Sequence, residues 1–330
     1  MPLLKASYTA PFWLRNGHVQ TLWPVLFRPK VAVSYRRQRI DTPDGDFIDL
    51  DMLSSPPTGT APRRVVILSH GLEGNSRRTY MTGMARMCHA HGWDVIARHM
   101  RACSEDMNRT RGITHMGDTD DIHTTVLHAC ALGYSQIALV GFSMGGNQSL
   151  NYISESPCRM PTAVRACVAV SVPCDLVSAV EVLSLPSRRL YMEYFLCTLR
   201  QKMRVKAQQF PDFPSVAHLA RMRTFAEFDG QFTAPVHGFS SALEYWTRAS
   251  CAPHLHRISI PTLLINAADD PFLTAPCYPV ETARTHPLLH LEIPAHGGHV
   301  GFVTRNRTNS YWTEQRVVDF LREALPPHEC

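Results

Sequence analysis

Charged residues are scarce in this sequence, at 18% of 330 residues, and the basic excess is small, with a net charge of +5. Because no block of like charge gathers this excess, it does not predict nucleic-acid binding. No run of about 18 apolar residues occurs, so we expect no membrane-spanning helix. Residues 1–10 lack an apolar core behind a basic start, so we also expect no signal peptide.

The ten cysteines are scattered, and no CxxC pair occurs among them. Their spacing therefore predicts neither a zinc ribbon nor a thioredoxin-like site. Several lie in apolar stretches, as Cys167 does between Ala166 and Val168, and are typical of small buried hydrophobic residues. This usage fits a reducing compartment. Together with the absence of a signal peptide, it predicts a cytoplasmic protein.

Short apolar runs alternate with helical patterns in the first half of the chain. The runs predict strands at residues 65–68, 93–97, 137–140 and 166–172. The patterns between them predict helices at residues 77–90, 117–131 and 143–153, the second with Asp118, Asp120 and Asp121 in its first turn. This order predicts a mostly parallel central sheet with helices on both faces, an α/β fold.

The remaining segments complete a single domain over residues 1–330. Alternation across residues 31–53 around Pro43-Asp44-Gly45 predicts an antiparallel hairpin at the sheet edge. Residues from about 174 to 253 contain no clear strand and predict a helical cap insertion. Strands are expected again at residues 262–266 and 288–293, before a final helix at 311–325.

Aromatic residues are frequent in the N-terminal arm, residues 1–30, which includes Trp13 and Trp23. We expect this arm to pack on the body of the protein, because Pro11, Gly17 and Pro24 argue against a long amphipathic helix. Contact with lipid or with an apolar substrate is the alternative.

The sequence Gly141-Phe142-Ser143-Met144-Gly145 has the form G-x-S-x-G and stands between a predicted strand and a predicted helix. In that context the serine occupies a tight, strained turn that exposes its hydroxyl above the sheet, at the positive end of the helix. We therefore predict that Ser143 is a nucleophile.

A serine hydroxyl needs a base and an acid that orients the base. In this fold the acid and then the base follow the serine along the chain, each after a late strand. Asp270 is the preferred acid, with Asp269 as the alternative. His299, flanked by Gly298 and Gly301, is the preferred base over His296. Without an HExxH motif, His296-x-x-His299 is weak evidence for a metal site.

Two backbone N–H groups are needed to stabilise the developing oxyanion. The amide of Met144, the residue after the nucleophile, is one candidate. The other is the amide of Leu72, in the His70-Gly71-Leu72 turn after an earlier strand, because that turn is similar to the loops that supply this donor in esterases.

Five motifs together resemble the YheT-like branch of the α/β-hydrolases. They lie at residues 16–22, 70–74, 141–147, 266–272 and 296–302, and the Gly-His-x-Gln-Thr motif at 17–21 is specific to that branch. The resemblance implies carboxylesterase or lipid-ester hydrolase activity with Ser143, Asp270 and His299 as the triad. It also implies that residues 101–104 and 108–109 match a loop of the family whose sequence usually contains Arg-Gly-Cys. Because Ala102 replaces that glycine, we expect a different loop there.

The sequence thus predicts a serine hydrolase of the α/β-hydrolase fold that cleaves carboxylic esters through an acyl-enzyme on Ser143. The apolar residues of the cap indicate a small ester with a short- to medium-chain acyl group: Leu183, Leu185, Leu190, Tyr191, Tyr194, Phe195 and Leu196. The resemblance implies that a lipid ester is the other possible substrate. No metal or cofactor is expected. The alternatives are thioester, amide or lactone cleavage on the same triad, or an idle fold that acts as a binding protein.

Overall fold

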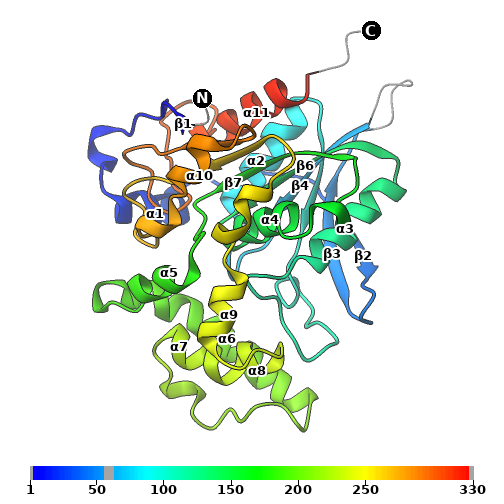
Figure 1. Ribbon diagram of the computed structural model, residues 1–330, viewed down its shortest axis with the longest axis vertical. Coiled ribbons are helices and arrows are strands. Elements are labelled where there is room, and N and C mark those ends of the chain that lie inside the picture. Colours follow the sequence, from blue (N-terminus) through cyan, green and yellow to red (C-terminus); the bar gives the residue numbers. More distant parts are fainter. Residues whose placement is uncertain (1–2, 56–62, 327–330) are drawn as a thin grey trace.

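A computed structural model describes residues 3–55 and 63–326 of the chain (Figure 1). Its centre is a nine-stranded sheet with the order β1-β9-β8-β7-β6-β4-β5-β3-β2. The strands span Leu3–Leu4 (β1), Arg36–Asp41 (β2), Phe47–Leu53 (β3), Arg63–Ser69 (β4), Asp94–Arg98 (β5), Tyr134–Phe142 (β6), Val164–Val170 (β7), Thr262–Ile265 (β8) and Leu289–Glu292 (β9). Along this spatial order, every neighbouring pair from β1 to β5 is parallel, whereas β3 pairs antiparallel with β5 and β2 pairs antiparallel with β3.

Helices cover both faces of this sheet, as the sequence predicts. Helices α2 (Thr79–Ala90) and α11 (Trp312–Ala324) pack on one face, and α3 (Asp120–Ala131), α4 (Met144–Ser154) and α10 (Val280–Thr285) pack on the other. Side chains of β4 alternate between the two apolar clusters, with Val66 on one side and Ile67 on the other. A strand buried on both faces needs this continuous apolar run.

A helical insertion separates β7 from β8 and lies at one end of the molecule (Figure 1). It contains α5 (Leu176–Leu183), α6 (Arg189–Gln209), α7 (Phe225–Phe228), a π-helical turn (Asp229–Thr233), α8 (Ala234–Val236) and α9 (Ala242–Ala249). The insertion has its own apolar cluster, which includes Leu196, Phe228 and Phe232. It therefore stands as a packed unit beside the sheet.

The N-terminal arm packs on the body through two elements. Strand β1 pairs with β9 at the sheet edge, and helix α1 (Gly17–Phe27) follows. The Asn16 side chain caps α1 by accepting hydrogen bonds from the amides of His18 and Val19. The arm thus contains an eleven-residue helix with Pro24 inside it, where the sequence argues only against a long one.

One local prediction is wrong, and the premise of a second does not hold. Helix α3 begins at Asp120, so Asp118 precedes the helix and lies outside its first turn. Ala102 adopts the left-handed backbone that alanine disfavours, with φ of 60°. The replacement of glycine by alanine therefore gives no reason for this loop to differ from that of the family.

Among the helices that the structure describes, none is long and apolar enough to cross a membrane.

Candidate active site

Ser143 lies between β6 and α4, in the turn that the sequence predicts. Its φ of 53° and ψ of −119° place it in strained backbone geometry. The flanking glycines make this turn feasible. A Cβ on Gly145 would stand 2.4 Å from the carbonyl oxygen of Ser69, and one on Gly141 would stand 2.3 Å from that of Gly145. The turn therefore accepts no larger residue at these positions without a backbone shift.

His299 and Asp270 reach this serine from the loops after β9 and β8. The Nε2 atom of His299 lies 2.9 Å from the Ser143 Oγ, and its Nδ1 lies 2.9 Å and 3.2 Å from the two carboxylate oxygens of Asp270. The Asp270 side chain is fully buried. Because β6, β8 and β9 are parallel, their carboxyl ends meet at one edge of the sheet, which brings these three residues together.

The two alternative residues form a second pair beside the first. His296 Nδ1 lies 3.3 Å from the Asp269 Oδ2, and the amide of Gly298 donates to the Asp269 Oδ1 at 2.8 Å. The two histidines therefore face different carboxylates and share no ligand position. Across residues 3–55 and 63–326, no three potential metal ligands gather in one place.

Helix α1 supports the loop that carries His299, which the sequence reasoning missed. The amide of His299 donates to the Thr21 Oγ1 at 2.9 Å, and that hydroxyl donates to the carbonyl of Gly17 at 2.7 Å. The amide of Val303 donates to the Gln20 Oε1. A Cβ on Gly17 would stand 1.8 Å from the carbonyl oxygen of Asp269.

These contacts explain the Gly-His-x-Gln-Thr motif at residues 17–21. The glycine permits close approach to the Asp269 loop, and the glutamine and threonine accept hydrogen bonds from the loop after β9. The resemblance singled out the motif but gave no reason for it. The signal was present in the sequence, whereas the contacts of Gly17, Gln20 and Thr21 with the loops after β8 and β9 join residues 250 or more positions apart.

The two predicted oxyanion donors lie close to Ser143. Met144 begins α4, so its amide is at the helix N-terminus, and Leu72 follows Gly71, where an added Cβ would stand 3.2 Å from the Cβ of Ser143. The neighbouring amide of Gly71 is already bound to the Tyr80 hydroxyl. Within the part of the chain that the structure describes, the Leu72 and Met144 amides donate to no protein acceptor. Both are thus free to bind an oxygen atom of a ligand.

Two apolar cavities meet at Ser143. The first, which we call the deep cavity, has a volume of about 90 Å³ and extends beneath the insertion among buried side chains such as Leu176, Leu199 and Phe225. The second, the outer groove, has a volume of about 530 Å³ and runs between α1 and α6. Ser143, His299, Leu72, Phe195 and Phe272 line both.

The apolar insertion residues divide between these spaces. Leu183 and Phe195 line the deep cavity, and Leu190, Tyr191, Tyr194 and Phe195 line the outer groove. Leu196 is buried within the insertion, and Leu185 is exposed. Residues 101–104, 108 and 109 line neither space. Instead, Arg101 binds the carboxylates of Asp44 and Asp121, which fits a structural role for that loop.

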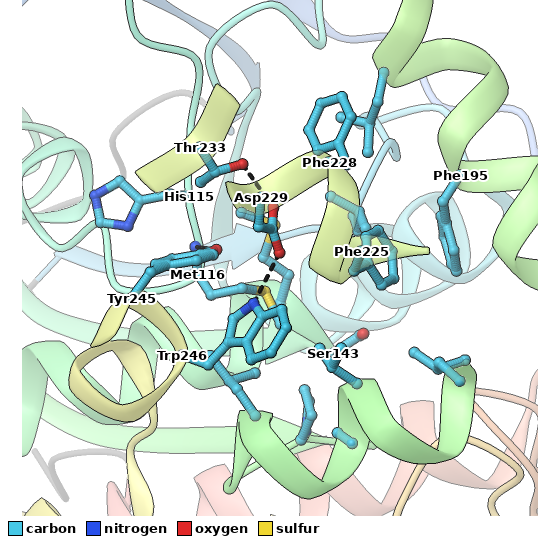
Figure 2. A pocket seen from close by; sticks show the side chains of 18 of the residues that line it. His115, Met116, Ser143, Phe195, Phe225, Phe228, Asp229, Thr233, Tyr245 and Trp246 are labelled. Atoms are coloured by element: carbon cyan, nitrogen blue, oxygen red, sulfur yellow. Dashed lines mark hydrogen bonds between the residues drawn. The ribbon is translucent and has the colours of Figure 1, made fainter. Parts of the chain in front are cut away.

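One carboxyl group, that of Asp229, interrupts the apolar lining of the deep cavity. It accepts hydrogen bonds from the Thr233 hydroxyl at 2.6 Å and from the indole N–H of Trp246 at 2.8 Å. Burial raises the pKa of Asp229 to about 6, although both hydrogen bonds oppose that rise. Burial also lowers the pKa of His115 to about 4. Figure 2 shows both residues on the side of the cavity away from Ser143.

Comparison with known proteins shows to which family the chain belongs. The sequence profile of the alpha/beta hydrolase fold matches residues 64–305, which contain Ser143, Asp270 and His299. The chain therefore belongs to the alpha/beta hydrolase fold family, and the predicted fold class is confirmed.

Particular relatives agree with the predicted branch. The chain is 34% identical over 319 residues to the Escherichia coli (strain K12) protein named "Putative esterase YheT", covering 96% of this chain and 93% of that protein. It is 29% identical over 308 residues to Homo sapiens phospholipase ABHD3, covering 92% and 75%. The Pyrococcus furiosus esterase Pf2001 shares the fold, with a TM-score of 0.57, 17% identity, and 88% and 93% coverage. The YheT-like resemblance is thereby confirmed.

Proposed function

We propose that this α/β-hydrolase cleaves carboxylic esters through an acyl-enzyme on Ser143, with His299 as the base and Asp270 as the acid that orients it. The observation that carries this proposal is the continuous line from the Ser143 Oγ through the His299 ring to the buried Asp270 carboxylate. That line ends where two apolar cavities meet. The esterase and phospholipase names of the relatives support the same reaction class.

The first half of the reaction forms the acyl-enzyme. His299 Nε2 accepts the Ser143 proton while the Ser143 Oγ attacks the ester carbonyl carbon. The amides of Leu72 and Met144 donate to the resulting oxyanion. As the carbon–oxygen bond to the alcohol breaks, His299 Nε2 passes its proton to the departing alkoxide. Asp270 accepts the Nδ1–H throughout, which holds the ring tautomer and stabilises the imidazolium.

The second half repeats these steps with water as the nucleophile. Water attacks the acyl carbonyl, His299 accepts its proton, and collapse of the tetrahedral intermediate returns that proton to Ser143 and releases the carboxylic acid. No metal or cofactor takes part in this scheme.

The cavities assign the two halves of the substrate. We place the acyl chain in the deep cavity, because its walls are buried side chains, and the alcohol in the outer groove, which is open at its rim. The helical insertion then acts as a cap over the acyl group. A volume of about 90 Å³ favours a short acyl chain. The larger groove accepts a bulky apolar alcohol, which includes the alcohol part of a lipid ester.

Labelling by a fluorophosphonate tests the proposal. We expect the wild-type protein to be labelled and the Ser143→Ala and His299→Ala variants to remain unlabelled, while all three unfold at similar temperatures. A series of p-nitrophenyl esters of rising acyl length should then show an optimum among the short chains. Absence of labelling in folded wild-type protein would favour an idle binding fold. Labelling with hydrolysis of thioesters, amides or lactones but not esters would change the substrate class.

A further inference from the structure

Exposed apolar side chains gather on two neighbouring elements. Thirteen large apolar side chains are exposed among the described residues, and seven of them lie within residues 12–27, with three more within 185–194. The most exposed are Leu190 at 86%, Phe12 at 81% and Val25 at 68%. We call these ten residues the apolar rim. Single exposed apolar residues are ordinary, whereas a cluster of this kind marks an interaction site.

Four residues of the apolar rim line the outer groove. Leu22 and Val25 belong to α1 and Leu190 and Tyr194 to α6, and the base of the groove reaches Ser143. The two helices are joined across it by a 3.0 Å hydrogen bond between His18 Nδ1 and the Tyr191 hydroxyl. An apolar molecule released from a surface that contacts the rim would therefore pass directly into the groove.

Positive charge accompanies the apolar rim. Arg15 precedes α1 and Lys30 follows it, and residues 12–30 contain no aspartate or glutamate. Arg188 and Arg189 precede Leu190 on the other side of the groove. Arg15, Lys30 and Arg189 are exposed, and none of these three makes an ion pair within the described residues. Apolar side chains beside exposed cations suit a surface that is apolar below a layer of anionic groups.

We infer that the apolar rim docks on an anionic phospholipid surface, with the mouth of the outer groove facing the lipid. Phe12, Val25 and Leu190 enter the boundary between headgroups and acyl chains, and the flanking cations bind lipid phosphates. Hydrolysis of the bound lipid rests on the proposed function, whereas binding to the lipid surface does not. A second copy of the chain suits the rim less well, because two such surfaces would bring like charges together.

Sedimentation with vesicles tests the docking surface. Wild-type protein should sediment with vesicles of phosphatidylcholine and phosphatidylglycerol, and much less with phosphatidylcholine alone or at high salt. The test variant is Phe12→Ser with Leu26→Ser, because both side chains are exposed and line neither cavity. Loss of two apolar side chains that would be buried in the lipid should weaken vesicle binding by about tenfold or more. The matched control is Leu127→Ser with Leu243→Ser, because these side chains are exposed on α3 and α9, outside the apolar rim, and also line neither cavity.

Hydrolysis of a soluble p-nitrophenyl ester separates this inference from the proposed function. The rim variant should keep the wild-type rate on the soluble ester while losing vesicle binding. Vesicle binding without ester hydrolysis would leave the docking surface in place and contradict the proposed function. Equal vesicle binding by the wild-type, rim and control proteins would overturn the inference. So would a wild-type dimer that becomes monomeric in the rim variant and binds no vesicle.

Discussion

Two His–Asp pairs lie side by side on the loops after β8 and β9, and they differ in what they reach. The pair of His299 and Asp270 is almost fully buried and ends on Ser143, whereas that of His296 and Asp269 keeps 34% and 19% of its side chains exposed. The residue types are the same, and the carboxylates are adjacent in sequence. The direction of the backbone, which α1 and the glycines of the loop set, therefore decides which pair reaches Ser143.

Removal of the charge from the buried pair should have the largest effect. In Asp270→Asn, the amide no longer stabilises the imidazolium of His299 and favours the wrong ring tautomer. We expect kcat on a p-nitrophenyl ester to fall by about 10³–10⁴-fold, as for triads in general. His296→Gln, in the outer pair, should leave kcat within about threefold of wild type, since an interaction between partly exposed side chains is weak. Similar losses in both variants would contradict the distinction.

Displacement of the loop that carries both carboxylates should have the next largest effect. A methyl group in Gly17→Ala would meet the Asp269 carbonyl oxygen at 1.8 Å, so the backbone must move. Because a displacement of about 1 Å near reacting groups can reduce the rate by about 10²-fold, we expect a loss of that order. Gly230→Ala is the control, since its Cβ would meet nothing within 4 Å. Unchanged activity in Gly17→Ala would show that the loop adapts.

Loss of one hydrogen bond to the His299 backbone should have a smaller effect. Thr21→Val removes the acceptor of the His299 amide while keeping the side-chain shape. An unpaired buried amide costs about 1–3 kcal/mol, and we expect the rate of fluorophosphonate labelling to fall by about tenfold. Thr21→Ser, which retains the hydroxyl, should restore it. A labelling rate that is equal in the valine and serine variants would exclude a positioning role.

Asp269→Asn should change turnover by about threefold or less. The amide oxygen can still accept the hydrogen bond from Gly298, and the interaction with His296 joins two partly exposed side chains. Measurement of kcat and KM on the same ester checks this outcome. A loss as large as that expected for Asp270→Asn would make the two carboxylates equivalent.

Asp229 offers a further comparison with Asp270, because it is also a buried carboxyl group but has no histidine partner. Its pKa is raised from 3.8 to about 6, so its contribution to stability is present below about pH 4 and is lost as the pH rises through 6. Asp229→Asn should lack this loss, which is about 3 kcal/mol at most. Thr233 can then accept a hydrogen bond from the amide. Urea unfolding of both proteins from pH 4 to pH 7 measures the difference, and parallel pH profiles would contradict it.

The three residues of the proposed triad could be predicted because their signals are local. G-x-S-x-G between a strand and a helix locates Ser143, and the order of strands locates the later loops. The choice between Asp269 and Asp270 could not be derived from spacing alone, because adjacent residues point in opposite directions only after the turn is formed. In the structure, the Asp270 carboxylate also accepts the amide hydrogen of Phe272, which fixes its direction toward His299.

Other features depend on contacts between distant segments. Strand β1 has only two residues, too few for a periodic signal, and pairs with β9 nearly 290 positions away. Ala102 adopts a positive φ that its residue type argues against. In the sequence, nothing distinguishes Asp229 from other acidic residues of a helical segment. Its place at the deep cavity is seen only in the structure, where it accepts hydrogen bonds from Thr233 and Trp246.

The position of α1 also bears on the smallest unit that can work. The family profile begins at residue 64 and includes all three proposed triad residues. Yet Thr21 binds the backbone of His299, and Gly17 lies against the loop of Asp269. A chain trimmed to begin at residue 64 would therefore keep every reacting group and lose the support that aligns them. The shortest active form of this protein should extend at least to the start of α1.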